Sequence, residues 1–186
     1  MQICFKNADK VDAITLTERA LHYGDGCFST VAVIDDVILM AQRHVDRLKF
    51  GAARLLLQFD EDLIQLSLAQ LRAEYGALNG SLKLLISRGE GQRGYSFPDH
   101  PADFYLFYYP NGRRELHAEY IESGVLQAKM GLKTPQLVGV KSLNCLEQVL
   151  FKHEADQQGW SEALVTDLNQ YVVEGVSSNC FFYIDG

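Results

Sequence analysis

The sequence predicts an α+β protein with two domains. Strand-like and helix-like segments alternate through the first part of the chain, and short strand-like segments dominate its C-terminal end. A polar stretch, NGRRELHAEYIESG at 111–124, separates the two patterns. We therefore expect an N-terminal α/β domain over residues 1–115 and the start of a C-terminal domain over residues 116–186.

The composition is that of an ordinary globular protein. The chain has 186 residues, is 47% hydrophobic and 22% charged, and carries a net charge of -7. No basic stripe is available to neutralise phosphates, which argues against a nucleic-acid partner. The sequence shows neither a membrane-length apolar run nor a signal-peptide pattern. The four cysteines are far apart, which favours a cytoplasmic protein with reduced thiols and no metal site.

Five segments of the N-terminal domain have the residue content of strands. They are Gln2–Lys6, Phe28–Ile34, Val37–Met40, Ser81–Arg88 and Phe104–Pro110, and a turn is expected over Asn7–Lys10. Asp35-Asp36 predicts a hairpin turn between the second and third of these strands. Apolar residues at helical spacing predict two helices, within residues 43–57 and 60–75, before the fourth strand.

A glycine-, arginine- and proline-rich loop, RGEGQRGYSFPDHPAD, joins the last two of these strands. Loops of that length in compact domains are usually functional or disordered. In the C-terminal domain we expect a strand near Val125–Met130, a helix from just after Lys141 to near Gly159, and an antiparallel meander of EALVTD, QYVVEG and NCFFYIDG. Asp185-Gly186 is a hairpin-turn dipeptide with no strand after it, which predicts a fragment with a truncated second domain.

The stretch VGVKSLNCLEQVL places Lys141 between apolar residues, just ahead of the predicted helix. Asn144 and Glu147 have the spacing of a capping box with Asn144 as the N-cap. The partial positive charge of the helix start and burial would both disfavour the ammonium form. A neutral lysine amine is a nucleophile and a base, and such lysines form Schiff bases. The alternative is a lysine whose stem covers apolar surface while its head reaches water.

A Schiff-base lysine suggests pyridoxal 5'-phosphate, which needs a carboxylate on its ring nitrogen and donors for its phosphate. Glu174 ends the apolar segment YVVE and is a candidate for the ring nitrogen. Arg47, within RHVDRL, is a candidate for the phosphate. Taken singly, each also has the pattern of an ordinary surface residue.

Four stretches together resemble the fold-type IV pyridoxal-phosphate enzymes, the group of branched-chain and D-amino-acid aminotransferases and 4-amino-4-deoxychorismate lyase. They are RALHYGDGCFST, RHVDRL, GVKSLNCLEQVL and VVEGVSSNCFF, in the family's order along the chain. The resemblance implies a two-domain, D-amino-acid aminotransferase-like architecture. It implies Lys141 as the Schiff-base lysine, Arg47 at the phosphate and Glu174 at the ring nitrogen. It also places Ser178 and Asn179 near the cofactor.

Within the group, the details are most similar to the lyase. Cys27-Phe28-Ser29-Thr30 resembles the lyase's small hydroxyl pair, whereas aminotransferases usually carry a glutamate or another bulkier residue directly after the phenylalanine. Leu146 stands where aminotransferases tend to have a tyrosine, and SRGEGQRGYS resembles the lyase loop. Cys145 departs from the lyase pattern, which commonly has arginine there, and we assign it no role.

The resemblance implies a small-molecule substrate, 4-amino-4-deoxychorismate, converted to 4-aminobenzoate and pyruvate in folate synthesis. Lys141 would move the proton, and Ser29 or Thr30 would place a hydroxyl near the reacting carbons. The alternative for Thr30 is an ordinary β-branched strand residue. Arg93 and Arg88 are candidates for the substrate carboxylates, although both would also suit a solvated loop.

Two other functions compete with the lyase. One is a branched-chain or D-amino-acid type aminotransferase, which would need a 2-oxo acid as amino acceptor. The other is a truncated, non-catalytic member of the fold that serves in binding or assembly. The resemblance further implies a homodimer.

Overall fold

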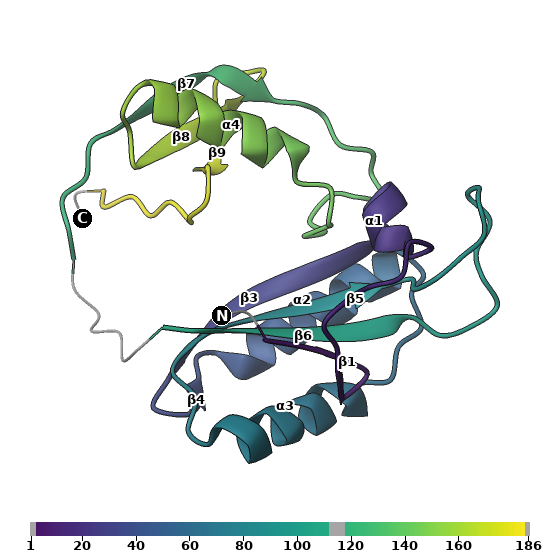
Figure 1. Ribbon diagram of the computed structural model, residues 1–186. Coiled ribbons are helices and arrows are strands. Elements are labelled where there is room, and N and C mark those ends of the chain that lie inside the picture. The colour runs from purple at the N-terminus through teal and green to yellow at the C-terminus, as the bar shows by residue number, and fades with distance from the viewer. Residues whose placement is uncertain (1–2, 112–117, 185–186) are drawn as a thin grey trace. The chain divides into compact units, whose positions relative to one another are not determined.

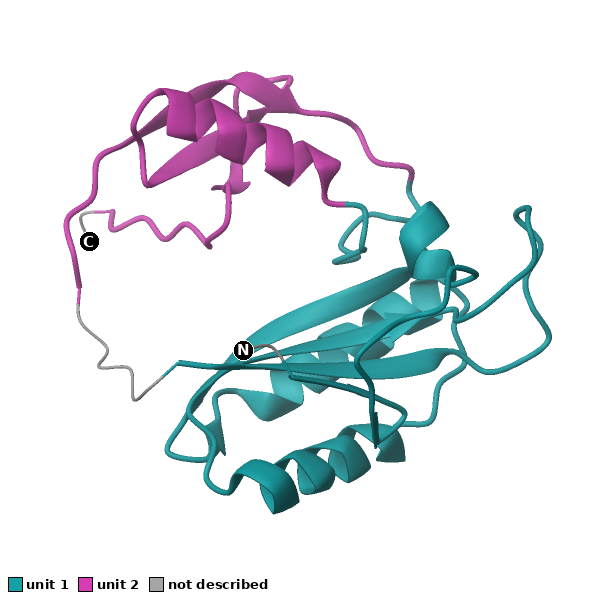
Figure 2. Ribbon diagram, viewed as in Figure 1, with its two compact units in different colours: residues 1–115, 135–144 teal, residues 116–134, 145–186 magenta. Residues whose placement is uncertain are grey.

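The computed structural model describes residues 3–111 and 118–184 (Figure 1). The chain forms two compact units (Figure 2). Unit 1 holds residues 1–115 and 135–144, and unit 2 holds residues 116–134 and 145–186. The sequence-based boundary assigned all of 116–186 to the second domain, whereas the segment 135–144, which carries Lys141, packs with unit 1. Within the described residues, no helix is long and apolar enough to cross a bilayer.

Unit 1 is built on a six-stranded sheet in the order β2-β1-β6-β5-β3-β4. Every pairing in this sheet is antiparallel. The strands are β1 (Ile3–Lys6), β2 (Asp9–Lys10), β3 (Gly26–Ile34), β4 (Val37–Ile38), β5 (Gly80–Ser87) and β6 (Asp103–Pro110). The hairpin between β3 and β4 was predicted, and Asp35 and Asp36 both take the positive φ angles, 48° and 66°, that a type I′ turn requires.

Helices cover one face of this sheet (Figure 1). They are α2 (Ala41–Arg54) and α3 (Asp62–Tyr75), and a short helix, α1 (Arg19–Tyr23), precedes β3. Leu48 of α2 and Leu71 of α3 are fully buried with Leu82 and Ile86 of β5. Burying each such side chain is worth about 1.5–3 kcal/mol, so this layer carries much of the stability of the unit.

The alternation of side chains along β3 decides which residues lie on which face of the sheet. Cys27, Ser29, Val31 and Val33 are buried on the helix-covered face. The residues between them, including Phe28 and the exposed Thr30, project to the opposite face, which α2 and α3 do not cover.

The described residues of unit 2 form a three-stranded sheet in the order β7-β8-β9 and one helix, α4. The elements are β7 (Ser123–Met130), α4 (Leu146–Gln157), β8 (Glu162–Asp167) and β9 (Val172–Gly175). β7 and β8 are parallel, and β8 and β9 are antiparallel. Phe151 and Ala155 of α4 are buried against Leu126, Ala163 and Val165. The predicted strand NCFFYIDG does not form over residues 179–184, and Asp185-Gly186 lies outside the described residues.

The predicted capping box at α4 is wrong. The helix begins at Leu146 with Cys145 at the N-cap, and no side chain caps it. The Asn144 side chain donates instead to the Gly24 carbonyl oxygen at 3.4 Å, within unit 1. Glu147 accepts from the Gly131 amide at 3.3 Å. A tertiary contact has therefore taken the side chain that the local pattern assigned to the cap.

Candidate functional site

Lys141 is held against the edge of β3 by backbone pairing. The Phe28 amide donates to the Lys141 carbonyl oxygen at 2.9 Å, and the Leu143 amide donates to the Gly26 carbonyl oxygen at 3.0 Å. Ser142 lies opposite Cys27 in an antiparallel bridge. Directly opposed residues in such a pair share a face, so Lys141 lies on the Phe28 face of the sheet.

The Lys141 side chain is exposed, and its amine is available. Its Nζ lies 4.8 Å from the centroid of the Phe28 ring. Within the described residues, no hydrogen bond or ion pair ties this Nζ. Val140, the residue before it, is buried in the core of unit 1 and anchors the segment. The structure therefore combines a fixed backbone with an amine that has no competing partner, as a lysine nucleophile needs.

A second lysine, which the sequence analysis did not single out, lies on the same ring. Lys83 Nζ of β5 is 4.6 Å from the Phe28 ring centroid, and among the described residues it has neither a hydrogen bond nor an ion pair. A cation on a ring face gains about 0.5–2 kcal/mol. Its signal in the sequence was one charge inside the apolar run SLKLLISR. Thr30, paired with Lys83 across the strands, completes this face.

Ser29 and Thr30 are adjacent in sequence but lie on opposite faces of β3. The Ser29 side chain is fully buried, and its Oγ contacts Arg47 Nε at 3.1 Å, Arg47 Nη2 at 2.5 Å and His44 Nδ1 at 2.7 Å. From the sequence, either hydroxyl was expected near the reacting carbons. Thr30 is on the face of Lys141, whereas the Ser29 hydroxyl is engaged with α2.

Arg47 has the surroundings of an anion-binding residue. It is exposed on α2, and its hydrogen bonds go to Ser29 and His44. Within the described residues no carboxylate forms an ion pair with Arg47, and its Nη1 has no hydrogen-bond partner. The Nε and Nη2 edge of this guanidinium is held by Ser29, and its Nη1 is open. Such a group is suited to bind a phosphate or a carboxylate.

Glu174, Ser178 and Asn179 belong to unit 2. Glu174 is half-buried on β9, and its Oε1 accepts from Gln148 Nε2 of α4 at 3.3 Å. The Ser178 carbonyl oxygen accepts from the Gly175 amide at 3.1 Å and closes the turn after β9. Asn179 is exposed. The Glu174 carboxylate has no cationic partner among the described residues, so it remains available to a protonated ring nitrogen.

The two arginines of the long loop have different surroundings. Arg88 is buried, and it donates to Asp25 Oδ2 at 2.8 Å and to the carbonyl oxygens of Leu55 at 2.7 Å and Leu56 at 3.3 Å. These contacts favour a structural role for Arg88. Arg93 is exposed, and no described residue forms an ion pair with it.

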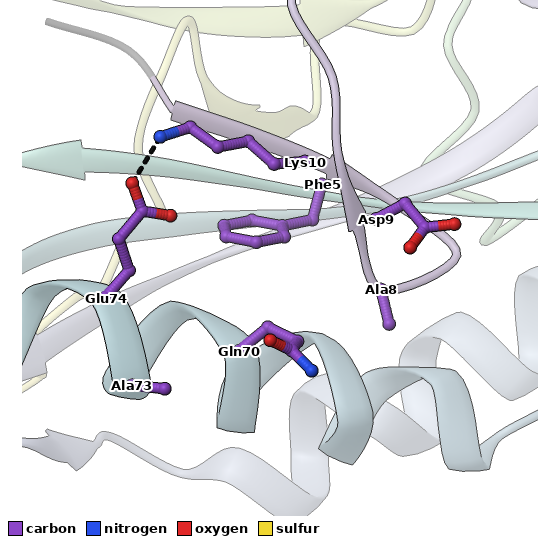
Figure 3. A pocket seen from close by; sticks show the side chains of 7 residues that line it. All are labelled: Phe5, Ala8, Asp9, Lys10, Gln70, Ala73 and Glu74. Carbon is purple, nitrogen blue, oxygen red and sulfur yellow. Dashed lines mark hydrogen bonds and ion pairs between the residues drawn. The ribbon is translucent and has the colours of Figure 1, made fainter.

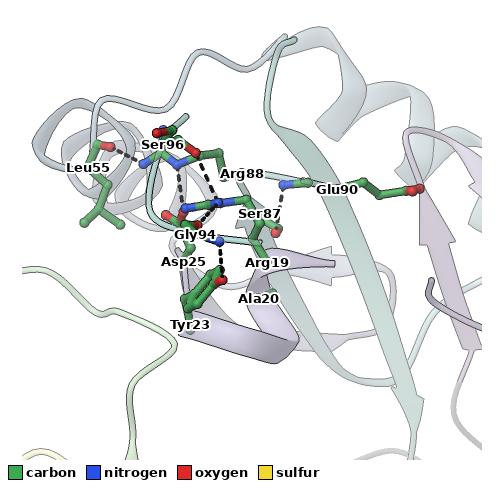
Figure 4. Close-up of polar contacts among 12 residues, drawn as sticks. Arg19, Ala20, Tyr23, Asp25, Leu55, Ser87, Arg88, Glu90, Gly94 and Ser96 are labelled. Atoms are coloured by element: carbon green, nitrogen blue, oxygen red, sulfur yellow. Dashed lines mark hydrogen bonds and ion pairs between the residues drawn. The ribbon is translucent and has the colours of Figure 1, made fainter. Parts of the chain in front are cut away.

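The long loop itself is fastened to α1. Arg19 donates to Asp25 Oδ2 at 2.9 Å and to the carbonyl oxygens of Gly94 at 3.0 Å and Ser96 at 3.2 Å. The Gly94 amide also donates to the Tyr23 hydroxyl at 3.1 Å (Figure 4). Asp25 thus bridges two buried arginines, Arg19 and Arg88. The loop that carries Arg93 is held at Gly94 and Ser96.

Two hollows in unit 1 lie away from Lys141 and Arg47. One, between the β1–β2 turn and α3, is bordered by Lys10 and Glu74, which pair with each other (Figure 3). The other, of about 350 Å³, lies beside Phe97 and includes Arg88 alone of the predicted site residues. The open charges on the Phe28 face and at Arg47 are therefore better candidates for ligand binding than either hollow.

Comparisons with known proteins agree on one family. The family model described as amino-transferase class IV matches residues 26–186. Aminodeoxychorismate lyase of Vibrio harveyi is 30% identical over 92% of this chain and 64% of its own. A putative branched-chain-amino-acid aminotransferase of Methanocaldococcus jannaschii is also 30% identical, over 97% of this chain and 64% of its own.

The same family is found among solved structures. The crystal structure of 4-amino-4-deoxychorismate lyase from Pseudomonas aeruginosa superimposes with a TM-score of 0.81 at 33% identity, covering 94% of this chain and 64% of that one. The expected α+β, fold-type IV architecture is thereby confirmed. The chain spans slightly less than two thirds of the length of these relatives.

Proposed function

Because the chain belongs to the class IV aminotransferase family, whose enzymes use pyridoxal 5'-phosphate, we propose that it takes part in a pyridoxal-phosphate-dependent lyase reaction. The reaction is the conversion of 4-amino-4-deoxychorismate to 4-aminobenzoate and pyruvate, a step in folate synthesis. The support comes from lyase relatives in both sequence and structure, at 30% and 33% identity.

The residues fit the cofactor by the chemistry of their free groups. Arg47 offers an open guanidinium edge to the phosphate, Lys141 offers an unpartnered amine to the carbonyl carbon, and Glu174 offers a carboxylate to the ring nitrogen. Ser178 and Asn179 follow Glu174 and belong to the same proposal. When bound, the cofactor supplies an electron sink for the charge that develops beside the substrate nitrogen.

In this proposal Lys141 is the general base and then the general acid. Its amine takes the proton from the carbon that bears the substrate nitrogen and returns a proton to the departing pyruvate group. Breaking the ether C–O bond leaves the ring aromatic, so the products are 4-aminobenzoate and pyruvate. The Thr30 hydroxyl, on the same sheet face, donates to the ether oxygen as it departs.

One observation favours the lyase reaction over aminotransfer. Thr30 is the small hydroxyl residue on the Lys141 side of β3, and Ser29, on the helix-covered side, is not available there. The aminotransferase pattern has a bulkier residue directly after the phenylalanine, at the position of Ser29, where this chain carries a small hydroxyl residue. Lys83 and Arg93 are the open cations that we assign to the two substrate carboxylates.

The test is an assay of the purified chain with pyridoxal phosphate and 4-amino-4-deoxychorismate. The lyase predicts that 4-aminobenzoate and pyruvate form in equal amounts without any 2-oxo acid, and that Lys141→Ala abolishes both. Lys49→Met is the control, because Lys49 is an exposed residue paired with Glu61. A strict requirement for a 2-oxo acid would instead establish the aminotransferase.

The remaining alternative is a non-catalytic member of the fold. It predicts that the chain folds but shows no cofactor absorbance and no product, with an intact mass of 186 residues. A homodimer and a cytoplasmic location also belong to the proposal. Analytical ultracentrifugation at micromolar concentration tests the dimer, and a single monomeric species would contradict it.

A further inference from the structure

Ser29, His44 and Arg47 form a closely contacting group on the helix-covered side of β3. Ser29 Oγ is 2.7 Å from His44 Nδ1, 3.1 Å from Arg47 Nε and 2.5 Å from Arg47 Nη2. Arg47 Nη2 is also 3.2 Å from His44 Nδ1. His44 and Arg47 are three residues apart on α2, which brings their side chains to one side of the helix.

The number of available protons fixes the direction of these hydrogen bonds. A guanidinium can only donate, and a serine hydroxyl has one proton to give. Ser29 Oγ therefore accepts from Arg47. His44 Nδ1 must also accept, because Arg47 Nη2 contacts it at 3.2 Å, and the Ser29 proton can point to the same nitrogen. That nitrogen must carry a lone pair, so His44 is neutral with its proton on Nε2.

The electrostatics of the group agree with this tautomer. Burial and the charge of Arg47 lower the pKa of His44. From β3 the neutral Ser29 faces the imidazole, and Arg47 on its own helix is the charge that acts on it. Both effects keep Nδ1 free to accept at neutral pH.

We propose that His44 is a positioning residue: it holds the Ser29 hydroxyl as an acceptor and so aims the free Nη1 edge of Arg47 at a phosphate group. The proposal rests on the proposed role of Arg47 in binding the cofactor phosphate. His44 does not contact the anion. It restricts the Arg47 side chain before the anion arrives, so the side chain loses less conformational entropy on binding.

Protonation of His44 distinguishes positioning from simple attraction. An added proton on Nδ1 removes the acceptor for the Ser29 hydroxyl and places a second cation beside Arg47. Positioning therefore predicts that anion affinity falls at low pH, although the net positive charge rises. A purely electrostatic role of His44 predicts the reverse.

The experiment measures sulfate binding to the purified chain by NMR, following the Arg47 Nε–H signal between about pH 4.5 and pH 8, because the pKa of His44 is lowered. Sulfate keeps one charge state over this range, so the titration belongs to the protein. We expect the affinity of the unsubstituted chain to fall as the pH drops below the lowered pKa of His44, by about tenfold once the imidazole is protonated, as for loss of one hydrogen bond. An affinity that rises or stays constant as the pH falls overturns the proposal.

Two substitutions at His44 make the test specific. His44→Asn keeps an acceptor near the position of Nδ1 and cannot titrate, so we expect near-normal affinity without pH dependence. His44→Ala should bind about tenfold more weakly at every pH. His22→Asn is the matched control, because His22 is exposed and contacts the Leu16 carbonyl oxygen. Unchanged affinity in His44→Ala, with a normal circular dichroism spectrum, overturns the proposal.

Arg47→Gln separates this inference from the proposed function. Loss of sulfate binding in Arg47→Gln together with normal binding in His44→Ala would refute the positioning role alone. Normal binding in Arg47→Gln would refute the phosphate role of Arg47, and the positioning role with it. Pyridoxal phosphate, followed by its absorbance, should give the same order of variants as sulfate.

Discussion

Phe28 and Lys141 contact each other through both backbone and side chain. The Phe28 amide donates to the Lys141 carbonyl oxygen at 2.9 Å, and Lys141 Nζ lies 4.8 Å from the centre of the Phe28 ring. The backbone bond fixes where the lysine leaves the edge of the sheet, and the ring limits where its amine can go. A reactive amine held this way loses little freedom when it meets a ligand.

Gly26→Ala should disturb this pairing. A Cβ at Gly26 would lie 2.3 Å from the Ile86 carbonyl oxygen and 2.8 Å from Leu143 Cδ1, so β5 or the Lys141 segment must shift. Overpacking of this kind costs about 1–3 kcal/mol. Urea unfolding should show that loss, together with weaker binding of pyridoxal phosphate. Gly131→Ala is the control, because its nearest neighbour is the flexible end of Glu147 at 3.4 Å.

Lys83→Met should weaken substrate binding more than turnover. Methionine keeps most of the length that covers Phe28 but removes the charge proposed for a substrate carboxylate. We expect KM for 4-amino-4-deoxychorismate to rise about tenfold and kcat to change little. Steady-state kinetics measure both constants, with Lys49→Met as the matched surface control. A fall in kcat at unchanged KM would exclude the assignment.

The two loop arginines should respond differently to substitution. Arg88→Met leaves Asp25 with one buried arginine partner fewer and frees two carbonyl oxygens, so we expect a loss of about 3 kcal/mol in urea unfolding. Arg93→Met changes an exposed side chain and should alter stability by less than about 0.5 kcal/mol. Its expected effect is a higher KM. A normal unfolding midpoint for Arg88→Met would contradict the structural role.

Unit 2 should lose stability in acid through Glu162. Burial alone would raise the pKa of Glu162, but hydrogen bonds from the Ser177 hydroxyl and the Ala163 amide outweigh burial and leave its pKa below the ordinary value. The unfolded state then binds more protons, so stability rises with pH between the folded and unfolded pKa values. The benefit is complete above about pH 4.5 and is lost as pH falls through the folded value.

Hydrogen exchange of the Val165 and Leu126 amides measures this effect within unit 2. Protection should fall as the pH drops below about 4.5, after correction for intrinsic exchange rates. Glu162→Gln should remove that part of the pH dependence. An unaltered acid profile in Glu162→Gln would show that other carboxylates govern the unit.

Local patterns predicted the strands and helices well but predicted side-chain partners poorly. Apolar periodicity located α2 and α3, and the Asp35-Asp36 pair located the hairpin. The Asn144 prediction failed because the partner of its side chain, Gly24, is 120 residues away along the chain. Arg88 and Asp25 are separated by 63 residues, so no local pattern could reveal that the arginine is engaged.

The family motifs predicted which residues matter but not how they are arranged. Lys141 and Arg47 were both identified from the sequence, yet the attachment of 135–144 to unit 1 follows from pairing with an edge of β3 that the sequence does not mark. Local spacing gives no signal for His44, because its contact with Ser29 arises where α2 crosses β3. Such crossings are set by tertiary packing, which spacing alone does not encode.

Thr30→Val and Ser29→Ala should affect different steps because the two side chains lie on opposite faces of β3. Thr30→Val keeps the shape of the side chain and removes the hydroxyl from the Lys141 face, so we expect kcat to fall about tenfold with normal cofactor binding. Ser29→Ala removes the acceptor for Arg47, so cofactor affinity should fall about tenfold, and saturating pyridoxal phosphate should restore most of the turnover. Cofactor titrations paired with steady-state kinetics separate the two effects. If both variants lost kcat equally at saturating cofactor, the division of roles between the faces of β3 would be wrong.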